Sequence, residues 1–275
     1  TIRIWEQRYN FLKPSRTSTN IRTYSNEELK EILTVALLNK YGYKISKIDN
    51  MLPAQRHNEV LSLQNSEAKT EYLVNTLLSC MIDLDIAGFE KLLNKHIEQH
   101  SISTTITTII FQFLEKVGIL WQTSRINPAH EHIVTNIIRQ KIIAAIEGLP
   151  IGDYTKPLHL LFLPEDQFHE LGLLFVYYLL KEKGLSVIYL GANVPLKDVK
   201  YIIAIKQPQH VYVHLTSIPS KLNLQKFITA VSAGDAHSYH VAISGYVTEF
   251  YKKSLPSNVS FLKSFSQVLA YIATL

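Results

Sequence analysis

Residues 167–172 read Gln167-Phe168-His169-Glu170-Leu171-Gly172, and they stand between an apolar run at 158–163 and a stretch with helically spaced apolar residues up to Lys183. The run predicts a buried strand, and the spacing after it predicts an amphipathic helix. The histidine then lies in a strand-to-helix turn, outside the carboxyl end of a strand, where open α/β sheets hold their ligands. A histidine that only lines or caps the turn is the alternative.

Four further apolar runs alternate with helical stretches; they lie at 185–190, 210–215, 240–244 and 259–262. This alternation predicts a parallel sheet covered by helices on both faces. We therefore expect a Rossmann-like α/β domain over residues 151–275, with flavodoxin-type strand order and a short linker at 152–157. In that order three strand ends share one edge. The groups expected to face a common crevice there are His169, Thr216, Ser217, Ser244 and Gly245.

Residues 67–150 predict a four-helix bundle. The helical stretches are 68–81, 85–99, 104–117 and 129–147, and the main breakers are Gly88, Gly118 and Pro128. Short connections make neighbouring helices antiparallel. This pattern by itself is equally typical of a spacer or a dimerisation module.

The first two dozen residues are strongly basic. They contain Arg3, Arg8, Lys13, Arg16 and Arg22 against one acidic residue, Glu6. Residues 1–10 can form a short helix that Pro14 stops, and Ser25 with Glu28 predicts a capping box for the next helix. A basic helix, a basic turn and a second helix can present cations to DNA phosphates while a few side chains reach base edges. A solvated charged face is the alternative.

The whole chain has 275 residues, of which 47% are hydrophobic and 19% charged, so two or three globular domains are expected. Its net charge of +5 permits an anionic partner. The single cysteine, Cys80, excludes an internal disulfide and fits the cytoplasm, where we expect the protein. We find no membrane-spanning run, signal peptide, nucleophile–base pair or phosphate loop, so neither a membrane partner nor an enzyme is expected.

The basic head also carries a specific pattern: Thr-Ile-Arg-Ile-Trp-Glu-Gln-Arg-Tyr at 1–9, then Leu12-Lys13-Pro14, Arg16, and Ile21-Arg22-Thr23-Tyr24-Ser25. This pattern resembles the MerR family of transcription regulators. The resemblance implies a winged helix-turn-helix over residues 1–66, whose first helix would precede Thr1. It makes 1–9 the recognition helix. The DNA-binding residues that it implies are Arg3, Trp5, Arg8, Tyr9, Arg16, Arg22 and Tyr24.

A second pattern consists of Trp121, at the end of the third bundle helix, and the pair Glu131-His132 on the fourth. It resembles the signature of the light-sensing, adenosylcobalamin-dependent repressors of carotenoid synthesis within the MerR family. The resemblance implies that these side chains surround the upper, adenosyl face of cobalamin. An indole supplies a flat apolar lid, while a carboxylate and an imidazole can bind ribose hydroxyls or adenine. Gln122 follows Trp121 where relatives have a histidine.

A third pattern lies in the predicted sheet domain and consists of Gln167, His169 and Gly172, then Thr216-Ser217-Ile218, then Ser244-Gly245. It resembles the cobalamin-binding domain, whose motif is Asp-x-His-x-x-Gly with a Ser-x-Leu element and a Gly-Gly pair. The resemblance implies that His169 is the lower axial ligand of cobalt. Gln167 replaces the acidic partner, and its amide oxygen can accept a hydrogen bond from the second ring nitrogen. The base tail of the cofactor would lie beside Thr216 and Gly245.

Together the resemblances imply a DNA-binding repressor that senses adenosylcobalamin, and through it light, with the cofactor held between the bundle and the Rossmann-like domain. Loss of the adenosyl group would shift the bundle, change subunit association and release DNA. The DNA-bound form would be a homo-oligomer, a dimer or tetramer, on a two-fold operator. Three alternatives stay open: a cobalamin-dependent but light-independent regulator, a cobalamin-free regulator, and a corrinoid carrier protein of a methyltransferase system.

Overall fold

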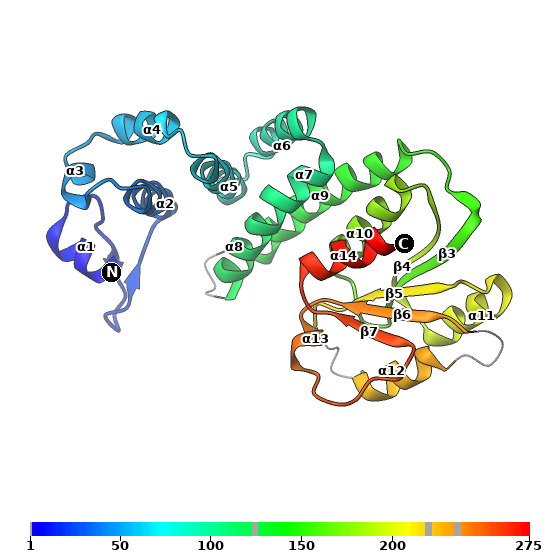
Figure 1. The fold of residues 1–275 in the computed structure, drawn as a ribbon. Coiled ribbons are helices and arrows are strands. Elements are labelled where there is room, and N and C mark those ends of the chain that lie inside the picture. The colour runs from blue at the N-terminus through cyan, green and yellow to red at the C-terminus, as the bar shows by residue number, and fades with distance from the viewer. Residues whose placement is uncertain (1, 123–125, 218–221, 234–237) are drawn as a thin grey trace. The chain divides into compact units, whose positions relative to one another are not determined.

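The internal contacts of the chain, in a computed structural model, separate it into two units, Thr1–Ile137 and Ile138–Leu275 (Figure 1). The structure describes residues 2–122, 126–217, 222–233 and 238–275, without the side chains of Ile2, Trp121, Gln122 and Tyr154. Within this part, no helix is long and apolar enough to cross a membrane. The division falls inside one long helix, and the three-domain boundaries at 66/67 and 150/151 stay a prediction.

A winged helix-turn-helix begins the first unit. Its elements are α1 (Ile2–Arg8), β1 (Ser15–Arg16), β2 (Arg22–Thr23), α2 (Asn26–Lys40), α3 (Ile45–Asp49) and α4 (Pro53–Ser62). The two strands pair antiparallel, with Ser15 opposite Thr23, and form the wing. The predicted capping box is present, because Ser25 accepts the Glu28 N–H while the Glu28 carboxylate accepts the Ser25 N–H at 2.8 Å.

The core of this head joins α1 to the three following helices. Its buried members are Trp5, Leu12, Val35, Leu37, Leu38, Ile48 and Val60. Arg56 on α4 is also buried; it donates to the Ile48 carbonyl at 2.9 Å and pairs with the carboxylate of Glu31 on α2. Removing one partner of such a buried pair is strongly destabilising. In addition to apolar packing, the ion pair with Glu31 therefore holds α4 against α2, and the hydrogen bond to Ile48 holds it against α3.

The predicted four helical stretches of the bundle are present. They are α5 (Ser66–Ile82), α6 (Ile86–His100), the consecutive segments α7 (Ile102–Thr105), η1 (Ile106–Ile110) and α8 (Phe111–Gln122), and α9 (Pro128–Glu147). The prediction that Gly88 and Gly118 break helices was wrong, because both lie inside one. Gly88 is in the first turn of α6, where its N–H donates to the capping Asp85 carboxylate at 2.9 Å. A glycine inside a helix costs only about 1 kcal/mol relative to alanine, which the packing of the bundle outweighs.

Ion pairs connect the head to the bundle within the first unit. Lys40 on α2 lies 2.6 Å from the carboxylate of Glu71 on α5, and Lys30 lies 2.6 Å from Asp83 just beyond the other end of α5. Lys116 on α8 approaches the same Glu71 carboxylate at 3.8 Å and donates to Asn75 at 2.8 Å. Each exposed pair stabilises only slightly, but together they connect α2, α5 and α8.

The second unit contains a five-stranded parallel sheet, as predicted. Its strands are β3 (Asp153–Pro164), β4 (Leu185–Val194), β5 (His210–His214), β6 (His240–Ser244) and β7 (Val259–Leu262). Their order, β4-β3-β5-β6-β7, is the predicted flavodoxin-type order. The predicted linker at 152–157 was wrong: β3 already begins at Asp153, which pairs with Leu185 before a register shift that ends at Leu158.

Helices cover both faces of this sheet (Figure 1). One face packs on α11 (Leu196–Lys206) and α12 (Leu224–Ser232), through a core that includes Phe162, Val213 and Phe227. On the other face lie α10 (Leu171–Glu182) and α14 (Phe265–Thr274), whose Phe175 and Phe265 rings stack at 5.7 Å. The short helix α13 (Val247–Phe250) follows β6. Because every strand is parallel, all their carboxyl ends share one edge.

Three histidines form a row across the face that α14 covers. His159 on β3 pairs in register with His210 on β5, which pairs with His240 on β6. The first two rings stack at 4.7 Å, and His210 contacts the hydroxyl of Tyr271 on α14 at 3.2 Å. Burial, and then the nearby His210, lower the pKa of His159 to about 4. The folded protein therefore holds this imidazole neutral.

This burial predicts a loss of stability in weak acid. The unfolded chain, with a histidine pKa of about 6.5, binds a proton before folded His159 does, so the free energy of unfolding falls as pH decreases from about 6.5 towards about 4. Between pH 8 and 5.5 we expect the titration of His159 alone to lower the free energy of unfolding by about 1.4 kcal/mol. Urea unfolding across this pH range should show a smaller decrease in the free energy of unfolding for His159→Phe than for the wild type. Equal decreases would contradict the neutral buried imidazole.

Candidate functional site

His169 lies in the turn between β3 and α10, at the carboxyl edge of the sheet. Its side chain is exposed, and so is Phe168, at 65% of its surface. The backbone beside it is fixed, because the Gln167 N–H donates to the Pro164 carbonyl at 3.1 Å and the Asn193 N–H on β4 donates to the Gln167 carbonyl at 3.0 Å. An accessible imidazole on a fixed backbone can act as a metal ligand.

Gln167 is buried beneath this turn, with only 2% of its surface exposed. Its amide nitrogen donates to the hydroxyl of Ser217, beyond the end of β5, at 3.4 Å. Its amide oxygen is buried and accepts a hydrogen bond from none of the residues that the structure describes. Buried acceptors are usually paired, so this oxygen is available to the N–H of a ligating imidazole. The residues present therefore fit a cobalt-bound cofactor with His169 as its ligand.

The end of β5 packs tightly against the start of α10. A Cβ on Gly172 would lie 2.4 Å from Nε2 of His214, so only glycine leaves room for that ring. The other ring nitrogen of His214 contacts the Ser244 hydroxyl at 2.8 Å, and Ser244 also contacts the Tyr212 hydroxyl at 2.6 Å. Burial lowers the pKa of His214 to about 4. No sequence motif indicates His214, because its role depends on contacts distant along the chain.

The positions at the ends of β5 and β6 require two corrections. Ser244 is 1% exposed and its hydroxyl binds interior groups, so it does not present that hydroxyl to a crevice. Gly245 has a φ of +100°, and its Cβ would lie 2.3 Å from the Leu215 carbonyl oxygen. Close packing of the two strand ends therefore explains this glycine. Thr216 is half-buried and Ser217 exposed, and Ile218 lies outside the described residues.

Glu131 and His132 lie in the first turns of α9. The Glu131 carboxylate is 3.5 Å from the His132 ring, whose side chain is 72% exposed. Thr135 donates to the Glu131 carbonyl at 2.7 Å, one turn further along the helix. Two adjacent polar side chains are thus available to a ligand. Trp121 is near the end of α8, and its side chain lies outside the described residues.

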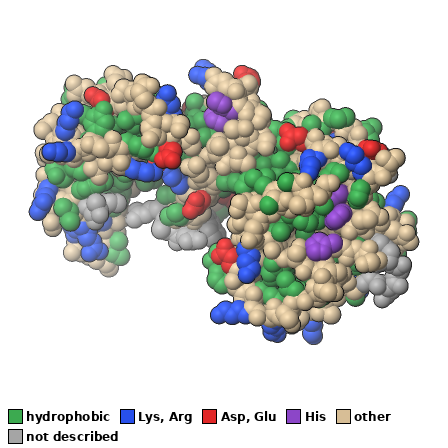
Figure 2. Space-filling model, in the orientation of Figure 1, with side chains coloured by type: hydrophobic (Ala, Val, Ile, Leu, Met, Phe, Trp, Pro, Cys, Tyr) green, Lys and Arg blue, Asp and Glu red, His purple; other side chains and the backbone are tan. Residues whose placement is uncertain are grey.

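The predicted DNA-binding residues differ in their surroundings. Arg3 and Arg8 on α1 are exposed, whereas Arg16 and Arg22 both pair with Glu6, the former at 2.9 Å. These two arginines lower the pKa of Glu6 through hydrogen bonds, mainly that from Arg22. Figure 2 shows Lys and Arg side chains on the surface of the head, and half-buried Tyr9 and Tyr24 belong to the same region.

Trp5 is not available to DNA in this structure. It is 8% exposed and meets Phe11 edge to face, with ring centroids 5.9 Å apart. The expectation that Trp5 contacts DNA is therefore corrected: a large apolar ring on the inner side of α1 fixes this helix to the rest of the head. It can orient the exposed arginines of that helix.

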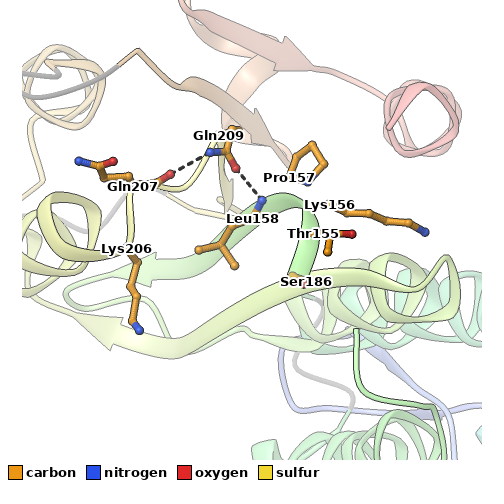
Figure 3. A pocket seen from close by; sticks show the side chains of 8 residues that line it. All are labelled: Thr155, Lys156, Pro157, Leu158, Ser186, Lys206, Gln207 and Gln209. Atoms are coloured by element: carbon orange, nitrogen blue, oxygen red, sulfur yellow. Dashed lines mark hydrogen bonds between the residues drawn. The ribbon is translucent and has the colours of Figure 1, made fainter. Parts of the chain in front are cut away.

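Two cavities lie away from these residues. One of about 450 Å³ is at the amino ends of the strands (Figure 3), where Gln209 accepts the Leu158 N–H at 2.7 Å and donates to the Gln207 carbonyl at 3.1 Å. This side chain connects the starts of β3 and β5. The other, of about 420 Å³, adjoins the turn between α2 and α3. Neither contains a predicted site residue.

The carboxylate of Glu170, next to His169, is another site residue that the sequence did not indicate. Glu170 contacts Nε of Arg139 on α9 at 2.5 Å and accepts from the Tyr189 hydroxyl on β4 at 3.0 Å. Burial is the main cause that raises the pKa of Tyr189 well above its usual value, with the nearby Glu170 adding to it. The sequence contains Glu170 within the histidine motif, but no local pattern indicates its two distant partners.

Two family models match the chain. Residues 1–55 match the MerR HTH family regulatory protein model, and residues 73–145 match the B12 binding domain model. The first match covers α1 to α3 and the start of α4, and the second covers most of the bundle. The chain is therefore similar to a MerR helix-turn-helix in its first part and to a B12 binding domain in the part that follows.

Two similar curated proteins are HTH-type transcriptional repressors. The HTH-type transcriptional repressor CarH of Myxococcus xanthus is 25% identical over 80% of this chain and 74% of its own. The repressor CarA of the same organism is 28% identical over 71% of this chain and 64% of its own, so the chain spans slightly less than two thirds of CarA. A monomethylamine corrinoid protein of Methanosarcina barkeri shares the fold, with a TM-score of 0.58 at 13% identity over 75% of this chain and 100% of its own.

The contact between Gly172 and His214 predicts a double-mutant cycle. Gly172→Ala should lower the free energy of unfolding by about 2 kcal/mol, because the added methyl overlaps a ring that Ser244 holds in place. In a His214→Ala background, the same change should be neutral or stabilising, because alanine is the better helix former. Urea unfolding of the four proteins measures both values. Equal losses in the two backgrounds would contradict this packing.

Proposed function

We propose that this chain, in which a MerR-type helix-turn-helix head precedes a B12-binding domain, is a cobalamin-responsive repressor of transcription. The observation that carries the proposal is the exposed His169 imidazole two residues after Gln167, whose buried amide oxygen has no hydrogen-bonding partner among the described residues. The similarity to two HTH-type transcriptional repressors supports the regulatory role. We propose adenosylcobalamin as the ligand and light as the signal.

The protein groups in this proposal have separate tasks. His169 donates a ring nitrogen to cobalt, and Gln167 accepts a hydrogen bond from the other, which fixes the tautomer of the imidazole. Ser217 holds the Gln167 amide from the end of β5. An amide brings no charge, so we expect His169 to be a slightly weaker ligand than one paired with a carboxylate. When bound, adenosylcobalamin supplies a cobalt–carbon bond that visible light breaks.

The bundle residues are proposed as contacts of the upper ligand. Glu131 can accept hydrogen bonds from hydroxyl or amino groups, and His132 is exposed enough to do so beside it. Trp121 is assigned to the same ligand from its resemblance alone. A ligand can release DNA only if it binds the DNA-bound and free assemblies with different affinity. We therefore propose a homo-oligomer, a dimer or tetramer, whose association changes with the upper ligand.

One prediction of the proposed function concerns the cobalt ligand. Protein mixed with adenosylcobalamin in the dark should retain the corrinoid through gel filtration, and His169→Ala should bind it about tenfold or more weakly, with a spectrum that lacks the histidine ligand. Loading the protein with divalent cobalamin, which is paramagnetic and carries no adenosyl group, allows a direct check. Labelling histidine with ¹⁵N should change the axial-nitrogen splitting in its electron paramagnetic resonance spectrum.

The control for this experiment is His100→Ala, which removes an exposed histidine from the end of α6. It should bind the corrinoid like the wild type. Loss of the corrinoid from the wild type during gel filtration would end the cofactor proposal and leave a DNA-binding regulator. Retained corrinoid without the nitrogen change would reject His169 as the ligand.

Another prediction of the proposed function concerns the affinity for DNA. A labelled duplex, selected by the dark adenosylcobalamin complex from a random-sequence pool, should lose about tenfold or more in affinity after green illumination. The double change Arg3→Ala/Arg8→Ala should weaken dark binding and make it less dependent on salt, because these exposed cations face phosphates. Lys95→Ala, which removes an exposed cation from α6, should change neither the affinity for DNA in the dark nor its dependence on salt. Unchanged affinity after illumination would instead favour the light-independent regulator, which Gln122 after Trp121 suggests.

A further inference from the structure

The Glu170 carboxylate is held on both of its oxygens. Oε1 lies 2.5 Å from Nε of Arg139 on α9, and Oε2 accepts from the Tyr189 hydroxyl on β4 at 3.0 Å. Its side chain is 15% exposed, against 46% for Arg139. A largely covered carboxylate with a cation and a hydroxyl donor is held more firmly than an exposed ion pair. All three residues belong to the second unit.

Aromatic packing and a second polar contact support these partners. The Tyr189 ring stacks on Tyr177 of α10 at a centroid distance of 4.9 Å and an angle of 11°. Lys181, one turn further along α10, lies 5.9 Å from the centre of the Tyr177 ring and donates to the Ile146 carbonyl in the last turn of α9 at 3.0 Å. The carboxyl half of α9 is therefore fastened to the second unit at Glu170 and at Lys181.

His169 has no comparable support. Among the described residues its imidazole has no hydrogen-bonding partner, so the ring is placed by its backbone, which lies between Gln167 and Glu170. On one side Gln167 is buried and hydrogen-bonded to Ser217. On the other side Glu170 is held by Arg139 and Tyr189. The backbone of His169 is thus fixed from both directions.

We propose that Glu170 is a positioning residue, which holds the turn so that the His169 imidazole is presented to cobalt. This inference rests on the proposed function, because it assumes that His169 is the ligand. Glu170 acts through the backbone and does not touch the metal. Without its two partners the turn samples more conformations, and ordering it again on binding lowers the apparent affinity.

The test compares Glu170→Gln, Arg139→Ala and Tyr189→Phe with the wild type and with Gln140→Ala, an exposed neighbour of Arg139 on α9. Hydrogen exchange of residues 165–172, measured without cofactor, should become about tenfold faster in the three variants and stay unchanged in the control. Adenosylcobalamin in the dark should bind these variants about tenfold more weakly, with a smaller fraction of histidine-ligated cobalt. The double variant Arg139→Glu/Glu170→Arg, which reverses the ion pair, should recover part of the slow exchange and part of the cofactor affinity.

The two measurements separate the possible failures. If the wild type ligates cobalt through His169 while the variants keep wild-type exchange and ligation, the positioning role of Glu170 is overturned and the proposed function stands. If the wild type shows no histidine ligation, the proposed function loses its ligand and the inference fails with it, whatever the exchange rates are. A loss of ligation that Gln140→Ala shares would also overturn the inference.

Discussion

The close approach of His214 to Gly172 fixes the geometry of the second unit at its carboxyl edge. The ring occupies the space that any side chain at position 172 would need, and it is held there by the Ser244 hydroxyl, which also contacts the Tyr212 hydroxyl. Because α10 can begin only against that ring, the turn between β3 and α10 has a defined place and His169 points outward from it. A neutral, half-buried imidazole at position 214 thus supports the position of the exposed imidazole at position 169.

The same edge of the sheet contains two kinds of polar group. Some are already paired inside the protein, such as the Ser244 hydroxyl, and these stabilise the fold. Others have no hydrogen-bonding partner in the part of the chain that the structure describes, namely the exposed His169 ring and the amide oxygen of Gln167, and these are available to a ligand. This division is the physical basis for assigning the cofactor role to His169 rather than to every polar residue at the strand ends.

In the first unit, the position of α1 depends on the packing of one apolar side chain. Trp5 is buried in the core that α2, α3 and α4 share, so the orientation of the exposed arginines of α1 follows from the packing of the whole head. Paired charges then join α2 to α5 and α5 to α8. A displacement of α8 would therefore act on α5, which already contacts α2 of the head.

The sequence alone determined the order of domains and most of the secondary structure, because apolar periodicity, the capping box at Ser25 and the spacing around His169 are local signals. It gave the flavodoxin-type order through general rules for parallel strands. Tertiary structure decided the rest. It buried Trp5, turned the Ser244 hydroxyl inward, and paired Glu170 with Arg139 and Tyr189, which lie 31 and 19 residues away. Such contacts form only when distant segments pack together, and no local pattern in the sequence records them.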